Sequence, residues 1–416
     1  MTSRIARIVA WIVVLTGLAG GCGKEQAPAP AGKPDTKGKP ASAPAAAVKL
    51  SAPEAETDAL GDEHLAKAQK LLNDGVRFLL SQREPDGGWS LGQGAMKPAI
   101  TALVVRSLLQ HPDFDRTSPQ VKTGLDLILN AQQPDGAIFD PKQGRPAYTT
   151  AIAMSTLIAA QDPQYDGAVR KASQYLQGIQ IQPGQESVDG TPVGPEDPNL
   201  GGVGYGSSKK PNLSVLQFVV EAWHDQGLPA DSKPMKEAVG FLTRIQNRSE
   251  SNPMAFAREG SNDGGFVYEM NASKAGADVG GAGQRSYGSM TYAGFKSMLY
   301  AGVDKNDPRV QAAYMWIRRF WRLESNPNMP KAQSKEGLYY YYLVFAKALR
   351  AWGQDGIPDI KDATVQHNWR QELIDALAER VRPNGSWTNN EDRWNEGYPV
   401  LVTSYCVQAL QEALRK

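Results

Sequence analysis

The sequence has few cysteines, few histidines and almost no net charge. Its 416 residues include only two cysteines and four histidines, and 45 basic residues nearly balance 44 acidic ones. Two cysteines exclude a fold held together by a disulfide framework. No basic stripe stands out, which argues against nucleic acid as a partner. No phosphate loop, nucleotide fingerprint or Gly-x-Ser-x-Gly elbow stands out either, so no cofactor is predicted.

The N-terminus has an apolar run, but a short one. Residues 8–18 are apolar, two arginines precede them, and the small residues Leu18-Ala19-Gly20-Gly21 lead to Cys22. A run of this length favours a cleaved export signal over a permanent transmembrane helix. The pattern resembles a bacterial lipoprotein signal, although Ala19 stands where Leu is usual. The resemblance implies a lipid on Cys22, which would tether the protein to the membrane. Ordinary secretion with cleavage nearby is the alternative.

Three regions follow from these features. Residues 1–22 are the predicted signal, residues 23–56 a disordered tether rich in Ala, Pro and Lys, and residues 57–416 a folded domain. The resemblance implies localisation to the cell envelope, facing the periplasm. Gly23 in place of Asp slightly favours the outer membrane. A lipid on Cys22 would leave no disulfide partner for Cys406, which is expected to be a small buried apolar residue.

The domain contains a repeated turn between apolar segments. The turn is clearest in residues 78–89, which end Pro85-Asp86-Gly87-Gly88-Trp89, and weaker copies occur around Asp135, Asp263 and Asn384. Proline and paired glycines stop a helix, and an apolar helical pattern lies on each side. Reading onward from residue 57 gives six such helix pairs. Long Gly- and Pro-rich loops interrupt the third and fourth pairs at residues 183–211 and 247–288, and loops of this length usually carry function or cover a site.

Six stacked helix pairs predict an all-α fold. A helix pair cannot bury its apolar faces alone, so the pairs should stack on one another. The natural closure is an (α/α)6 toroid, a double ring with the second helix of each pair inside and the first outside. No segment alternates as an extended sheet would, although short hairpins in the loops are compatible with the sequence.

The turn resembles the repeat of squalene and terpene cyclases and of protein prenyltransferase β-subunits, the prenyltransferase/squalene oxidase repeat. The likeness covers residues 60–416 and includes inner-helix starts such as residues 211–218, 288–294 and 399–405. It implies the terpenoid cyclase and prenyltransferase superfamily of α/α toroids. In the turns, Gln, Asp and Trp suit structural roles as caps and spacers. These residues are therefore predicted to be scaffold: Gln82, Asp86, Trp89, Asp135, Asp263 and Trp387.

The catalytic motifs of those enzymes are missing. The Asp-x-Asp-Asp proton donor of the cyclases is absent, and so is the Asp-rich motif that binds magnesium and diphosphate. The zinc site of prenyltransferases needs Asp, Cys and His, but no histidine begins an inner helix and Cys406 lacks an Asp two residues before it. No metal is predicted, and whether the protein is an enzyme stays open.

The candidate ligand cavity is the barrel end where the inner helices start. Tyrosines and threonines there suit a ligand that is partly apolar and partly polar, or they simply cap helices and pack loops. The candidates are Tyr148, Thr150, Asn212, Ser214, Tyr287, Thr291, Tyr339, Tyr340, Trp394, Tyr398 and Thr403. Glu396 is the first acid to test for catalysis, since its loop precedes an inner helix; a solvated loop glutamate is the alternative.

The leading hypothesis is an envelope-anchored toroid of uncertain catalytic activity. It would bind a lipid, a terpenoid, a glycan or a protein partner in its central cavity. Two alternatives stay open. One is an active squalene or terpene cyclase that uses an unrecognised acid. The other is a polysaccharide lyase or glycosidase built on the same (α/α)6 scaffold, whose site would pair acids, or a Tyr with a His or Arg.

Overall fold

The computed structural model describes residues 49–187, 190–206, 210–278, 281 and 283–416. The predicted signal with Cys22, and most of the predicted tether, lie outside these residues. Within them, no helix is both long enough and apolar enough to cross a membrane.

Twelve helices of the described chain form six pairs, as the sequence predicts. The first helices of the pairs are α1 (Gly61–Ser81), α3 (Pro119–Asn130), α5 (Asp166–Gly178), α7 (Lys233–Arg244), α10 (Pro308–Arg319) and α12 (Trp369–Ala378). The second helices are α2 (Lys97–Leu109), α4 (Pro146–Ala159), α6 (Leu213–Asp225), α9 (Gly288–Tyr300), α11 (Leu338–Trp352) and α13 (Pro399–Leu414).

The connections contain only short elements. The long loop before α9 carries the helix α8 (Ala255–Glu259), and three 3-10 turns lie at Pro163–Tyr165, Lys331–Gln333 and Arg393–Asn395. Two short strands, β1 (Gly356–Pro358) and β2 (Gln366–Asn368), pair antiparallel between α11 and α12, with Gly356 opposite Asn368. The hairpin that the sequence allowed therefore lies in a loop, and its residue Ile357 is fully buried in the core.

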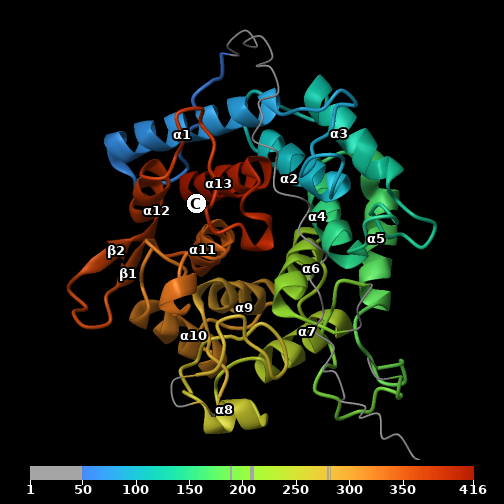
Figure 1. Cartoon of the computed structure of the whole chain (residues 1–416), viewed down its shortest axis with the longest axis vertical. Helices are drawn as coiled ribbons and strands as arrows, with labels where there is room; N and C mark the ends of the chain where they lie inside the picture. The colour runs from blue at the N-terminus through green and yellow to red at the C-terminus, as the bar shows by residue number, and fades with distance from the viewer. Residues whose placement is uncertain (1–48, 188–189, 207–209, 279–280, 282) are drawn as a thin grey trace, which may run out of the picture. The chain divides into compact units, whose positions relative to one another are not determined.

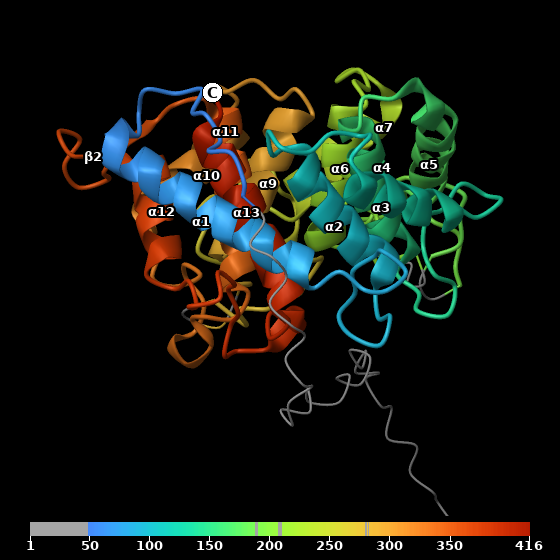
Figure 2. The ribbon, with the colours of Figure 1, turned by 90° about the horizontal axis from the view of Figure 1, so that it is seen from above.

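The second helices form a closed inner ring. α2 packs on α4, α4 on α6, α6 on α9, α9 on α11, α11 on α13, and α13 again on α2 (Figure 1). The first helices cover this ring from outside; α1, the first of them, packs mainly on α13, the last inner helix (Figure 2). The (α/α)6 toroid is confirmed, because the first and last pairs close the ring.

The inner and outer helices differ in how many of their side chains are buried. The inner helices α2 and α4 bury nearly every side chain, which is typical of a helix apolar all round. The outer helix α1 instead buries one stripe, including Leu72, Val76 and Leu79, and exposes the opposite face. The free cysteine Cys406 is fully buried in α13, as expected.

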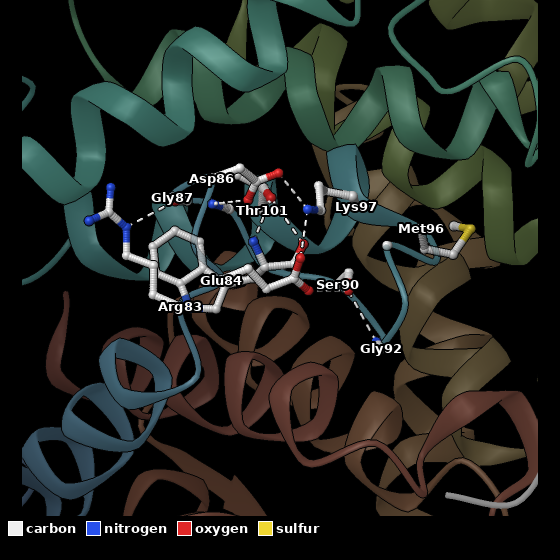
Figure 3. A network of polar contacts seen from close by, with 12 residues as sticks. Arg83, Glu84, Asp86, Gly87, Ser90, Gly92, Met96, Lys97 and Thr101 are labelled. Atoms are coloured by element: carbon white, nitrogen blue, oxygen red, sulfur yellow. Dashed lines mark hydrogen bonds and ion pairs between the residues drawn. The ribbon is translucent and has the colours of Figure 1, made fainter. Parts of the chain in front are cut away.

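The repeated turns have the predicted scaffold role. The side chains of Asp86, Asp135 and Asp263 each accept a hydrogen bond from the backbone N–H two residues later, at 3.0–3.1 Å. Trp89 and Trp387 are fully buried, and their indole N–H groups donate to carbonyls of the preceding outer helix. In the first turn, Lys97 bridges the carboxylates of Glu84 and Asp86 at 2.6 Å each (Figure 3).

The predicted role of Gln82 is wrong. Its side chain is exposed and donates only to Ser81 Oγ among the described residues, while Arg83 contacts the turn carbonyl of Gly87. Glutamines in three later pairs do join neighbouring units: each donates to a turn glycine carbonyl and to a backbone carbonyl at the start of the next outer helix. These are Gln132, Gln180 and Gln246. Gln82 lies one position before the residue equivalent to these glutamines, so its side-chain amide cannot reach the turn carbonyl.

A glycine with positive φ lets five of the six turns lie against the next outer helix. Gly201 has φ 76°, and an added Cβ would lie 1.9 Å from the carbonyl oxygen of Glu237 in α7. In the last turn, Gly385 has φ 79°, and a Cβ there would lie 2.6 Å from the carbonyl oxygen of Asp74 in α1. The sixth turn thus contacts the first helix as the other turns of this kind contact their successors.

Candidate functional site

The threonines at the inner-helix starts hold the turns in place. The hydroxyl oxygens of Thr150, Thr291 and Thr403 accept hydrogen bonds from the backbone N–H groups of Ile138, Phe266 and Trp387, at 2.8–3.1 Å. All three threonines are fully buried. Thr101 does the same for Trp89 in the first pair. These hydroxyls anchor their turns to the inner helices that follow.

Two other predicted residues lie at the start of α6. Asn212 is its N-cap, and its side-chain oxygen accepts a hydrogen bond from the Val215 N–H at 3.0 Å. Ser214 is half-buried and lies beside the hydroxyl of Tyr340 from α11. α6 and α11 are separated in the ring by α9, so this approach crosses the barrel interior.

Four aromatic side chains meet at the barrel axis, and we call them the tyrosine cluster: Tyr148, Phe218, Tyr340 and Tyr405. Their successive ring centroids are 5.3–6.2 Å apart, with Tyr148 edge-on to Phe218. The hydroxyls of Tyr148 and Tyr405 lie 3.4 Å apart. The four come from α4, α6, α11 and α13, which are not all neighbours in the ring, so they fill its centre.

The long loops add two more tyrosines. These are Tyr205, from the loop before α6, and Tyr268, from the loop before α9; burial and the nearby Tyr205 together raise the pKa of both Tyr268 and Tyr340. The Arg145 guanidinium lies 5.5 Å from the Tyr205 ring centroid, and the Lys274 ammonium 4.3 Å from that of Tyr268. These loops thus reach the end of the barrel where the inner helices start, consistent with the expectation that long loops cover a site.

The cluster is neutral and contains an unused donor. Burial raises the pKa of Tyr148, Tyr340 and Tyr405 above its ordinary value, so these hydroxyls keep their protons. Within the described residues, the buried Tyr340 hydroxyl makes no hydrogen bond of good geometry, although the side chains of Ser214 and Gln217 lie close enough to offset part of the rise in its pKa. Because nearly all buried polar groups in folded proteins are paired, this hydroxyl at the barrel axis is a candidate contact for a ligand atom.

The remaining predicted aromatics lie around the cluster. Tyr287 and Tyr398 precede α9 and α13 at their N-caps, the first buried and the second half-buried. Tyr339 is buried and packs edge-on against Tyr342. Trp394 lies at the rim with 40% of its surface exposed. The tyrosine cluster thus contains Tyr148 and Tyr340 of the predicted residues, and the sequence gave no sign of Phe218, Tyr405, Tyr205 or Tyr268.

Glu396 is buried, so it is not the solvated loop glutamate that the sequence offered as the alternative. Its carboxylate accepts hydrogen bonds from Tyr340 N–H and Asn389 Nδ2, both at 2.7 Å, and faces the first N–H groups of α11. Burial raises the pKa of Glu396 to about 7, and the hydrogen bonds offset part of that rise. A carboxylate at a helix N-terminus compensates the unpaired N–H groups there, so this geometry fits a cap of α11.

Beneath the aromatic layer lies a buried ion network that the sequence interpretation missed. Glu221 of α6 lies 2.6 Å from Lys296 of α9, 3.5 Å from Arg106 of α2, and also pairs with Lys347 of α11. Asp225 pairs with Arg106 at 2.9 Å, and Glu412 of α13 with Arg350 at 3.1 Å. Five of the six inner helices contribute, and the pairs cross the barrel near the C-terminal ends of these helices.

The network is ionised around Glu221. Three neighbouring cations hold the pKa of Glu221 well below its ordinary value despite its burial, whereas burial lowers the pKa of Lys296 to about 8. Lys296 also donates to Gln217 Oε1, and the Gln217 amide nitrogen has no partner within the described residues. Charged residues inside helices that are otherwise apolar all round were the signal that could have found this layer.

The described part of the chain shows no cluster of side chains suited to binding a metal ion. No three His, Cys, Asp or Glu side chains gather there in a way that could hold an ion. Glu269, near the cluster, pairs with Lys210 at 3.0 Å. The arrangement as a whole offers apolar faces and neutral hydroxyls at one level of the barrel, above a layer of compensated charge.

No family model matches the sequence, and no curated protein resembles it significantly. Solved structures do share the fold. A protein from Actinoplanes superposes with TM-score 0.51 at 16% identity, over 83% of this chain and 99% of that one. The apo type II terpene cyclase MstE from Scytonema superposes with TM-score 0.53 at 15% identity, over 84% of this chain and 99% of that one.

A second structure of that cyclase is a complex with its substrate, geranylgeranyl dihydroxybenzoate. It superposes with TM-score 0.51 at 14% identity, over 85% of this chain and 98% of that one. At these identities the likeness concerns the fold alone. The domain is thus an α/α toroid like that of a terpene cyclase.

Proposed function

We propose that this protein is an envelope-anchored toroid that binds a terpenoid-type lipid at the tyrosine cluster. The observation that carries the proposal is the unpaired hydroxyl of Tyr340 among aromatic rings at the barrel axis. The aromatic rings of the cluster supply apolar faces for an isoprenoid chain, and the Tyr340 hydroxyl supplies a hydrogen bond to a polar group on that chain.

The electrostatics of the cluster favour a ligand without charge at this level. Tyr148, Tyr340 and Tyr405 are neutral, and the nearby carboxylates of Glu269 and Glu396 are engaged by Lys210 and by the start of α11. A charged group placed among these rings would lose its hydration, a cost that a neutral ligand avoids. The complex of MstE with geranylgeranyl dihydroxybenzoate supports the ligand class, since that toroid holds an isoprenoid chain.

Binding without cyclisation is the simpler assignment. The sequence lacks the Asp-x-Asp-Asp proton donor, and the acids near the cluster already have partners. Protonation of an alkene needs an acid whose proton points into the cavity. The tyrosine hydroxyls, with pKa values raised by burial, are too weak to serve as that acid.

Binding is tested by titrating the purified full-length protein with geranylgeraniol and following intrinsic tryptophan fluorescence or native mass spectra. Tyr340→Phe keeps the ring and removes the hydroxyl, so Kd should rise about three- to tenfold, the usual worth of one hydrogen bond. Tyr165→Phe, a buried tyrosine at the start of α5, is the matched control and should leave Kd unchanged. Absence of binding by the unaltered protein would refute the proposal.

A second candidate, an active cyclase, is favoured by one observation. Glu396 is a buried carboxyl whose pKa of about 7 leaves it partly protonated at neutral pH. Incubation of the protein with squalene, followed by a search for cyclised product, decides between the two functions. If product forms, Glu396→Gln should abolish it; product that persists in this variant would exclude Glu396 as the acid.

The anchoring is proposed from the N-terminal sequence. A lipid on Cys22 would attach the toroid to the membrane, facing the periplasm, with the outer membrane favoured by Gly23. Metabolic labelling with an alkyne fatty acid should mark the protein, and Cys22→Ala should lose the label. Fractionation of the envelope identifies the membrane; an unlabelled, freely released wild-type protein would contradict the anchor.

A further inference from the structure

A basic cleft lies outside the barrel, between the loop that joins α10 to α11 and the end of α12. Its volume is about 540 Å³. Four cationic side chains and one acidic side chain line it: Arg322, Lys331, Lys335, Arg380 and Glu324. Neutral groups that can donate or accept hydrogen bonds, among them Ser325, Ser334 and Asn328, complete the lining. The cleft thus combines positive charge with polar groups.

The cations of the cleft are only partly compensated. Arg322 lies 3.7 Å from Glu324, and Arg380 lies 2.8 Å from the exposed Glu379. Lys331 and Lys335 are exposed and have no ion pair with any residue that the structure describes. Their ammonium groups are therefore available to a negatively charged ligand, whose attraction would weaken with salt.

The loop that carries these lysines is held firmly. Asn326 is buried, accepts a hydrogen bond from the Ser289 N–H and donates to the Glu336 carbonyl, each at 3.0 Å. Asn328 donates to the Ser286 carbonyl at 2.6 Å, and the Tyr341 hydroxyl to the Arg322 carbonyl at 2.8 Å. The cleft is thus tied to the starts of α9 and α11, so its charges keep a defined arrangement before any ligand arrives.

An exposed tryptophan adjoins the cleft. The ring of Trp394 packs on Gly337, where an added Cβ would lie 2.8 Å from Trp394 Cζ3 and 3.7 Å from Nδ2 of the cleft residue Asn326. Trp394 itself has φ 59°, in the left-handed region, and keeps 40% of its surface exposed. Its ring also has the Arg393 guanidinium 4.5 Å from the centroid. An apolar ring face beside a basic cleft suits the face of a sugar ring.

We propose that this cleft binds an acidic saccharide. Lys331 and Lys335 would bind its carboxylates, and Trp394 would stack on one of its sugar rings. The site is separate from the tyrosine cluster and does not depend on the function proposed for it. An acidic saccharide accounts for both features, because its carboxylates need cations and its rings offer C–H faces to an aromatic side chain.

The test uses the full-length protein and calorimetric titration with trigalacturonate at low ionic strength. The neutral maltotriose and inorganic phosphate serve as comparison ligands. We expect trigalacturonate to bind, maltotriose to bind at least tenfold more weakly, and phosphate to compete poorly. Raising the salt concentration should weaken the binding of trigalacturonate.

Variants locate the site. The double variant Lys331→Glu with Lys335→Glu should weaken trigalacturonate binding at least tenfold, whereas Lys236→Glu, an equally exposed lysine on α7, should not. Trp394→Ala should weaken the binding of the saccharide and leave any binding of phosphate unchanged. Far-ultraviolet circular dichroism and thermal unfolding check that each variant is folded.

Three outcomes would overturn the proposal. The first is no binding of trigalacturonate; the second is binding that the double lysine variant leaves intact. The third is phosphate that displaces trigalacturonate at equal concentration, since the cleft would then hold small anions without recognising a sugar. Because the lysines are exposed, the double variant stays informative even if Trp394→Ala fails to fold.

Discussion

Single side chains decide whether the barrel interior is stable. Glu221 compensates three cations that come from three other inner helices, and it is almost fully buried. Removing one member of a buried network leaves the others without a counter-charge, which costs more than the network contributes when intact. Glu221 is therefore the residue on which the lower layer of the barrel depends.

Glu221→Gln should destabilise the protein by about 3–5 kcal/mol. The substitution keeps the shape and removes the charge, so Lys296 and Lys347 become uncompensated and Arg106 keeps only Asp225. Urea unfolding followed by circular dichroism measures the change. Glu63→Gln is the control: Glu63 is exposed and lies 3.8 Å from Lys67, so its loss should cost less than about 1 kcal/mol. Equal effects of the two substitutions would argue against a stabilising network.

Glu396 should make stability depend on pH in the opposite sense to most carboxylates. Its pKa rises from the ordinary 4.5 to about 7 in the folded chain, so the folded state binds more protons than the unfolded state between these values. The contribution of Glu396 to the free energy of unfolding is present below pH 4.5 and is lost as the pH rises through about 7. The total loss is about 3 kcal/mol.

Glu396→Gln cannot titrate and isolates that contribution. Between pH 4.5 and 8, the difference in unfolding free energy between the wild type and this variant should shift steadily in favour of the variant. Urea unfolding at a series of pH values measures it. Parallel pH profiles for the two proteins would mean that Glu396 keeps an ordinary pKa in the folded state.

At the scale of the elements, the turns determine how one helix pair contacts the next. The turn residue Gly201 meets the carbonyl of Glu237 in α7 so closely that no side chain fits. The glutamines of three pairs add a second connection by donating to both the turn and the next outer helix. These three junctions are therefore specified by a tight contact of a turn glycine together with one hydrogen-bonded amide.

Gly201→Ala should be clearly more destabilising than Gly227→Ala. Both glycines have φ 76°, but an added Cβ at Gly227 meets nothing within 4 Å, whereas at Gly201 it would lie 1.9 Å from a carbonyl oxygen. Conformational strain alone should cost about 1 kcal/mol at either site, and the clash at Gly201 adds to it. Thermal unfolding compares the two variants. Equal losses of stability would show that the contact with α7 relaxes freely.

At the scale of the whole domain, α1 closes the ring. It covers α13, and the Glu56 N–H donates to the Leu414 carbonyl at 2.7 Å, so the start and end of the described chain are joined. A helix pair at an open end of such a ring would expose an apolar face to water. Closure therefore makes the six pairs one cooperative unit.

Removal of residues 1–81 should abolish cooperative unfolding. The deletion takes α1 away and uncovers α13, whose Val402, Leu410 and Leu414 are buried. Calorimetry should then give no sharp transition. Removal of residues 1–48 alone is the control and should leave the transition in place. A sharp transition in the longer deletion would mean that the pairs fold independently of closure.

Most of the architecture was predictable because it rests on local signals. Asp86-Gly87 and its copies mark turns within a few residues, and apolar periodicity marks the helices around them. The error over Gln82 was a shift of one position, which local pattern cannot detect because Arg83 and Gln132, which differ chemically, donate to equivalent carbonyls, those of Gly87 and Gly136. The tyrosine-rich end was predictable only as a region, since the starts of the inner helices gather there.

The sequence by itself determined the six helix pairs and their turns, because each depends on residues close together in the chain. Only the tertiary structure decided which side chains meet inside. Tyr148 reaches Tyr405, and Glu221 reaches Lys347, across a ring whose members lie far apart in the chain. Those contacts follow from ring closure, which brings non-neighbouring helices to a common axis, and no local pattern specifies which of their residues arrive at the same height.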